Sequence, residues 1–153
     1  MMRRWQVGFS LCGVVLSFAS VVLAQSAPVG APTIVNARTV TFTSPPQIPG
    51  LSAAWAIGNE KGPGPYLLLV KLERGAKIRP HHHPDPRIMT VFSGKLAVGF
   101  GDSFNEGSMT VVSSGDSFLV PANVPHYSQA QGGDVEYQEC GQSPTGTVFV
   151  ERR

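Results

Sequence analysis

Two short stretches decide how this chain folds: GAKIRPHHHPDPRIMTVFSG at residues 75–94 and GDSFLVPANVPHYSQA at residues 115–130. Both begin with glycine and contain runs of β-branched and aromatic residues, which favour extended backbone. The four histidines of the chain all lie within these two stretches. We therefore expect these two stretches to form part of the core sheet structure and to contain the functional site.

The histidine spacing predicts a metal site. Successive side chains of an extended segment point to opposite faces, so His81 and His83 project together while His82 projects away. His126 supplies a third imidazole if its strand lies alongside. Imidazole nitrogens bind divalent transition metals, and three of them leave positions open for water or substrate. The alternative is a solvated histidine-rich loop, against which the flanking apolar strands argue.

The rest of the chain is a series of short β-prone runs separated by glycine, proline, asparagine and aspartate. This pattern is typical of an antiparallel sandwich or barrel, and no window shows a competing helical period. We expect an all-β fold with a single domain. The predicted strands are residues 35–43, 55–57, 66–72, 77–83, 87–92, 95–100, 109–112, 118–120, 126–129, 135–139 and 147–151.

The first stretch resembles a motif of the cupin superfamily. That motif consists of Gly, five residues, His-x-His, three or four residues, Glu, six residues and Gly. Here Gly75, His81, His83 and Gly94 occupy the fixed positions, and Arg87 stands where the family has Glu.

The second stretch resembles the other cupin motif, in which Gly, Pro, Gly, His and Asn recur at fixed spacing. Gly115, Pro121 and His126 match it, while Asn123 and Ala130 replace the second Gly and the final Asn. Asparagine tolerates the left-handed backbone that glycine adopts, so we expect the first replacement to keep the turn. The resemblance implies a double-stranded β-helix, or jelly-roll barrel, with a metal ion bound inside.

Arg87 is the main departure from the family pattern. The family's Glu is a fourth metal ligand, whereas an arginine has no lone pair to donate and stays charged. Three neutral imidazoles leave the ion with a charge of about +2, which favours an anionic ligand. A cation beside it needs a negative partner. We therefore weigh three placements for Arg87: it binds a substrate anion, it pairs with Asp85, or it turns away from the barrel mouth.

The N-terminus predicts export. A basic start followed by an apolar run and a small-x-small end is typical of a signal peptide, here residues 1–24 with cleavage between Ala24 and Gln25. A retained membrane anchor is the alternative, although the run is short for a bilayer span. We expect residues 25–33 to form a flexible leader and residues 34–153 the barrel domain.

Charge and cysteine content limit the partners further. Loss of Arg3 and Arg4 with the signal lowers the 12 basic residues to 10, equal to the 10 acidic ones. A neutral mature chain gives no electrostatic case for nucleic acid or for a membrane surface. The same two arginines leave general and twin-arginine export both open. Only Cys140 survives processing, so no intramolecular disulfide forms.

These features define three functional hypotheses. The first is an exported, dioxygenase-like oxidoreductase that uses one divalent metal, Fe or Mn before Cu, Zn or Ni, on a small anionic organic substrate. The second is a non-catalytic periplasmic cupin that binds a metal or a small ligand. The third is a sugar isomerase or epimerase. Resemblance to cupins also implies a homodimer.

Overall fold

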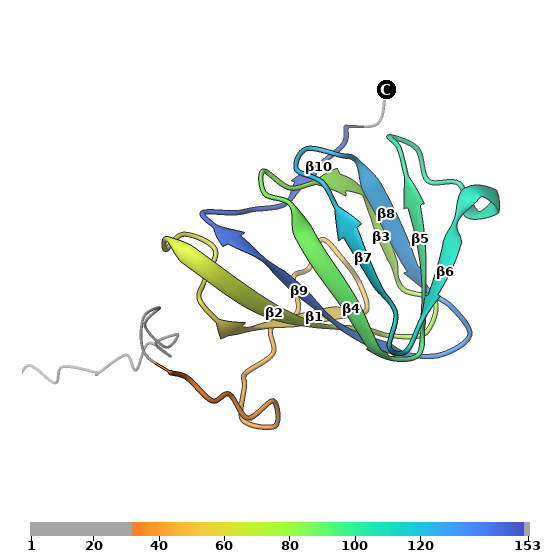
Figure 1. Ribbon diagram of the computed structural model, residues 1–153. Helices are drawn as coiled ribbons and strands as arrows, with labels where there is room; N and C mark the ends of the chain where they lie inside the picture. Colours follow the sequence, from red (N-terminus) through yellow and green to blue (C-terminus); the bar gives the residue numbers. More distant parts are fainter. Residues whose placement is uncertain (1–31, 152–153) are drawn as a thin grey trace, which may run out of the picture.

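The barrel consists of two five-stranded antiparallel sheets that face each other (Figure 1). A computed structural model describes residues 32–151. The first sheet has the order β1 (Leu51–Ile57), β2 (Gly64–Leu72), β9 (Val135–Ser143), β4 (Arg87–Ser93) and β7 (Ser117–Val120). The second has the order β10 (Val148–Phe149), β3 (Lys77–His82), β8 (His126–Ala130), β5 (Lys95–Phe100) and β6 (Thr110–Ser113). This is the jelly-roll barrel expected from the two motifs.

Alternation along the strands builds the interior. On β4, Arg87, Met89 and Val91 are buried while Ile88 is exposed, so every second side chain points into the barrel. Aliphatic and aromatic side chains from both sheets fill most of this space. The core comprises Leu51, Val70, Leu72, Ile78, Met89, Val91, Leu96, Val98, Val120, Ala130, Val135 and Tyr137.

Asn123 and Gly94 both adopt left-handed backbone at turns, as the sequence predicts for Asn123. Asn123 has a φ of 61°, so asparagine adopts the left-handed backbone of the motif's glycine. Its N–H donates to the His83 carbonyl at 2.7 Å, which ties the loop after β7 to the histidine segment. Gly94 has a φ of 80° between β4 and β5, and a Cβ there would collide with the Asp134 carbonyl.

The strand predictions fail at the two ends of the described chain. Residues 35–43 do not form a strand; Thr43 alone makes an isolated bridge to Ala53. Strand propensity depends on packing against neighbours, and residues 36–39, 41 and 43 of this segment are exposed. The first strand of the barrel is therefore β1, which begins at Leu51. At the other end, β10 is shorter than predicted.

The predicted signal peptide and all but the last two residues of the predicted leader lie outside the described residues, so export stays a prediction. Within residues 32–151, the structure has no helix of the length and apolarity that crossing a bilayer requires.

A substitution at Gly99 on β5 would test how tightly the side chains of the second sheet pack. A Cβ at Gly99 would collide with the Tyr127 ring, whereas nothing lies near a Cβ at Gly133. We expect Gly99→Ala to lower the free energy of unfolding by about 1–3 kcal/mol, since overpacking displaces a buried ring. Urea unfolding measures this change, with Gly133→Ala as the control. Equal stability of the two variants would contradict the packing described for Tyr127.

Candidate metal centre

Three histidines meet inside the barrel. His81 on β3 lies directly opposite His126 on β8 in the strand register, and His83 follows the end of β3. The ring centroid of His81 lies 4.2 Å from that of His126 and 4.9 Å from that of His83. One nitrogen of each ring lies within 4.8 Å of the other two. All three side chains are buried, so these nitrogens surround a common point from two neighbouring strands.

Backbone carbonyls fix the tautomer of each ring. Nδ1 of His81 lies 2.7 Å from the Arg79 carbonyl, Nδ1 of His83 lies 2.7 Å from the Gly146 carbonyl, and Nδ1 of His126 lies 3.1 Å from the Val124 carbonyl. A carbonyl only accepts, so each Nδ1 carries the proton and each Nε2 keeps its lone pair.

The free lone pairs fit a metal ion. Within the described part of the chain, the buried Nε2 atoms of His83 and His126 have no hydrogen-bond partner. Buried polar atoms are normally paired, and three acceptor nitrogens facing one point have no common hydrogen-bond donor. A divalent cation satisfies all three at once. His81, His83 and His126 are thus positioned to hold the metal that the sequence predicted.

The rings stay neutral at physiological pH. Burial lowers the pKa of His81 to about 3 and that of His83 to about 4, and burial likewise lowers the pKa of His126. The neighbouring imidazoles and the Arg87 guanidinium add to the shift of His81. A metal ion therefore meets little competition from protons above mildly acidic pH.

His82 lies outside this group, as the alternation predicts. It lines a groove on the outer face together with Arg79 and Phe149, whose ring stacks against the Arg79 guanidinium. The first and third histidines of the trio face inward while the second faces out.

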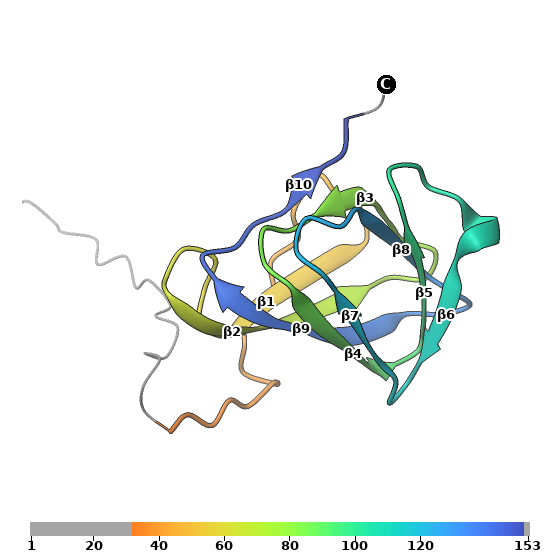
Figure 2. The ribbon, with the colours of Figure 1, turned by 45° about the horizontal axis from the view of Figure 1, so that its top comes forward.

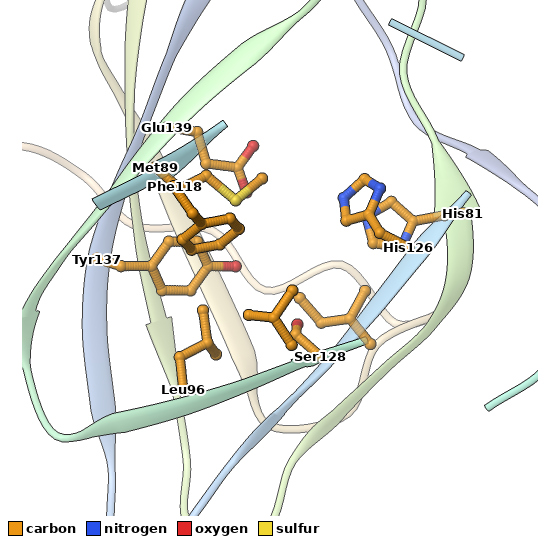
Figure 3. A pocket seen from close by; sticks show the side chains of 10 residues that line it. His81, Met89, Leu96, Phe118, His126, Ser128, Tyr137 and Glu139 are labelled. Carbon is orange, nitrogen blue, oxygen red and sulfur yellow. The ribbon is translucent and has the colours of Figure 1, made fainter. Parts of the chain in front are cut away.

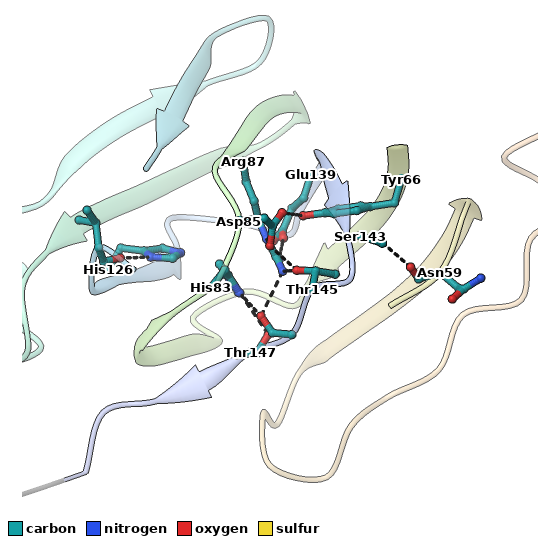
Figure 4. A network of polar contacts seen from close by, with 12 residues as sticks. Asn59, Tyr66, His83, Asp85, Arg87, His126, Glu139, Ser143, Thr145 and Thr147 are labelled. Atoms are coloured by element: carbon teal, nitrogen blue, oxygen red, sulfur yellow. Dashed lines mark hydrogen bonds and ion pairs between the residues drawn. The ribbon is translucent and has the colours of Figure 1, made fainter. Parts of the chain in front are cut away.

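Arg87 is buried and tightly held, with 3% of its surface exposed. Its Nη1 donates to Glu139, and its Nη2 donates to the Thr145 hydroxyl at 2.7 Å and to the Gly146 carbonyl at 3.2 Å (Figure 4). Its Nε lies 3.6 Å from an Asp85 carboxylate oxygen. The predicted pairing with Asp85 is present, whereas the placement away from the barrel mouth is wrong because the interior carboxylates hold the side chain.

Asp85 is fixed from several sides. Tyr66 donates its hydroxyl hydrogen to Asp85 at 2.6 Å, and the Thr145 hydroxyl also donates to this carboxylate. Burial, and then the hydrogen bond to Asp85, raise the pKa of Tyr66 well above its usual value. Both carboxylate oxygens of Asp85 thus accept hydrogen bonds from protein hydroxyl groups.

Glu139 is the functional candidate that motif reasoning missed. It lies on β9, opposite Met89 of β4, and is buried. A signal for it exists in the sequence, because Glu139 shares the inward parity of Val135 and Tyr137 within one predicted strand. A charged residue at an inward position needs a partner, and Arg87 on the adjacent strand provides it.

A small cavity separates Glu139 from the histidines. Its volume is about 10 Å³, room for about one water molecule. Figure 3 shows His81 and His126 on one side of it and Glu139, Met89, Phe118 and Tyr137 on the other. Ser128 also lines the cavity. The space beside the imidazoles therefore has room for little more than a water molecule.

Comparisons with known proteins agree with this architecture. A family model described as a cupin domain matches residues 68–137. An RmlC-like cupin from Shewanella frigidimarina aligns with a TM-score of 0.59 at 18% identity, over 73% of this chain and 91% of that chain. The polyketide cyclase RemF from Streptomyces resistomycificus aligns with a TM-score of 0.67 at 15% identity, over 80% of this chain and 88% of that chain.

A third structure is an enzyme complex. Salicylate 1,2-dioxygenase from Pseudoaminobacter salicylatoxidans, in adducts with gentisate, aligns with a TM-score of 0.56 at 22% identity, over 68% of this chain and 30% of that chain. These identities are low, so the structural likeness shows the fold alone. No curated protein sequence matches the chain significantly.

Residues 68–137 match the cupin domain model, so the chain contains a cupin domain, and its double-sheet barrel is the cupin fold. Its particular form is a small single-barrel cupin with three histidines placed for a metal and a buried Arg87 at the position of the usual glutamate.

Replacing one inward histidine should remove the metal without unfolding the barrel. We expect His83→Ala to weaken binding of a divalent metal by more than about 100-fold, because loss of a ligand costs more than loss of an outer partner. His82→Ala is the matched control and should bind normally. Metal content by elemental analysis and circular dichroism of both variants measure this. Full metal content in His83→Ala would contradict the assigned ligand set.

Proposed function

We propose that this protein is an exported metal-dependent oxidoreductase of the dioxygenase-like kind, acting on a small organic anion. One observation carries the proposal: three buried imidazoles converge beside a small cavity, and the Nε2 atoms of His83 and His126 have no hydrogen-bond partner. Such a ligand set leaves coordination positions open. Fe or Mn held there would supply redox chemistry and sites for oxygen or substrate.

The residues around the histidines have separate tasks in this proposal. Met89, Phe118 and Leu96 exclude bulk water from the cavity. Arg87 is the cation that an anionic substrate group would meet, and in the structure Glu139 takes that position against the guanidinium. A substrate larger than water requires side chains of the lining, such as Met89 or Phe118, to move aside.

A non-catalytic metal- or ligand-binding cupin is the second candidate. The small size of the cavity favours it, because about 10 Å³ holds a water molecule and no organic substrate. The hydrogen bonds from both terminal nitrogens of Arg87 to protein groups also favour it. No feature of residues 32–151 specifically favours a sugar isomerase or epimerase.

Export is part of the proposal and rests on the sequence alone. The basic start, apolar run and small-x-small end of residues 1–24 support cleavage before Gln25. We expect the mature protein in the periplasm or the medium with Gln25 as its first residue. Mass spectrometry of the fractionated native protein tests this, and an intact Met1 in a membrane fraction would contradict it.

Oxygen consumption separates the two candidates. Protein loaded with Fe²⁺ or Mn²⁺ is incubated with a panel of small carboxylates and thiols in an oxygen electrode. We expect at least one compound to give oxygen uptake about 10-fold above that of the His83→Ala variant, since the redox metal requires all three imidazoles. Tight stoichiometric metal without turnover on any panel member would favour the binding protein instead.

A further inference from the structure

Arg87 forms a buried cluster of charged side chains with two carboxylates. Asp85, Arg87 and Glu139 are all at most 7% exposed, and their ion pairs place them in one cluster. Two carboxylates and one guanidinium carry a net formal charge of −1. A cupin motif with glutamate at position 87 also provides −1 beside three neutral imidazoles. The cluster thus replaces the charge that the arginine substitution removed.

The two carboxylates of the cluster differ in what holds them. Asp85 accepts from Tyr66 and Thr145 and lies 3.6 Å from Arg87 Nε. Glu139 pairs with Arg87 and lines the water-sized cavity that His81 and His126 also line. Figure 3 shows the Glu139 carboxyl group on the wall across the cavity from these rings. Glu139 is therefore the carboxylate that faces the metal position.

We propose that Glu139 is the acidic partner of the metal in this protein, acting across the cavity while Arg87 positions it. The inference rests on the metal site of the proposed function and adds a residue that the motifs do not contain. The residues whose ligand atoms lie within 4.8 Å of one another are His81, His83 and His126, and Glu139 is not among them. We therefore assign it outside the ligand shell, where it attracts the cation and accepts a hydrogen bond from water in the cavity.

The physical reason is compensation of buried charge. A cluster with net charge −1 in an apolar barrel is costly in isolation, and a divalent cation close by offsets that cost. Arg87 reduces the formal charge of the two carboxylates from −2 to −1, and its ion pair with Glu139 holds that carboxylate on the far side of the cavity from the imidazoles. Without Glu139, a divalent cation would share the interior with an arginine paired only to Asp85, and binding would weaken.

One carbonyl links the cluster to the ligands. The Gly146 oxygen accepts from Nδ1 of His83 at 2.7 Å and from Nη2 of Arg87 at 3.2 Å. Arg87 thus shares an anchor with one ligand while it also pairs with Glu139. The loop after β9 therefore fixes the ligand ring and the acidic partner relative to each other, as outer contacts of metal sites commonly do.

The variant Glu139→Gln tests this inference, because it removes the charge and keeps the shape. We expect the dissociation constant for Zn²⁺, measured by competition with a chelator, to rise about 10- to 100-fold. Glu136→Gln is the matched control: Glu136 is on the same strand but pairs with Lys71 on the outer surface, at half exposure. This control should bind Zn²⁺ like the wild type.

The visible spectrum of bound Co²⁺ separates an outer partner from a ligand. We expect the spectrum of Glu139→Gln to keep the band positions of the wild type, since the three imidazoles remain. A change of less than about 3-fold in the Zn²⁺ dissociation constant would overturn the inference, because an outer partner costs more than that. A shifted Co²⁺ spectrum with larger loss of affinity would also overturn it by making Glu139 a ligand.

Two further controls keep the outcome decisive. If Glu139→Gln fails to fold, Glu139→Met, which also removes the charge at similar side-chain length, takes its place with the same thresholds; Glu139→Asp, which keeps the charge, should bind Zn²⁺ more tightly than either. Wild-type protein that binds no Zn²⁺ or Co²⁺ would refute the metal site itself. Normal binding by both wild type and Glu139→Gln would refute the role of Glu139 alone.

Discussion

The candidate site depends on the register of β3 against β8. His81 and His126 are direct partners across this antiparallel pair, and alternation then brings His83 to the same side. A slip of one residue would turn the imidazoles out of the barrel and bring His82 in, because side chains alternate with a period of two. Between Ile78 and His81 the pairing of β3 with β8 shifts by one residue, and this irregularity lets both side chains be buried in the barrel.

Charge compensation is the second requirement of the interior. Each buried ionic group has partners: Arg87 has two carboxylates, and Asp85 also has the hydroxyls of Tyr66 and Thr145. Much of this pairing involves the segment after β9, which contributes Thr145 and the Gly146 carbonyl. The second sheet provides His81 and His126, while the first sheet provides the charges opposite them. A cation at the imidazoles would bring the two halves of the barrel into electrostatic contact.

Sequence reasoning was sufficient for the local part of this arrangement. The period of two placed His81 and His83 inward and His82 outward, and the glycine pattern located the left-handed turn at Asn123. It could not find the pair of Arg87 with Glu139, because that contact requires β9 to lie beside β4, and strand order is set by the whole fold. It also overestimated residues 35–43, where β propensity has no neighbouring strand to act on.

The central claim is that one ion binds to three Nε2 atoms inside the barrel. X-ray absorption spectroscopy of the full mature protein, loaded with one equivalent of Zn²⁺, tests it most directly. We expect a single ion per chain with scattering from three imidazoles and metal–nitrogen distances of about 2.0–2.1 Å. Fewer than three imidazoles around the ion, or failure of the ion to load at all, would contradict it.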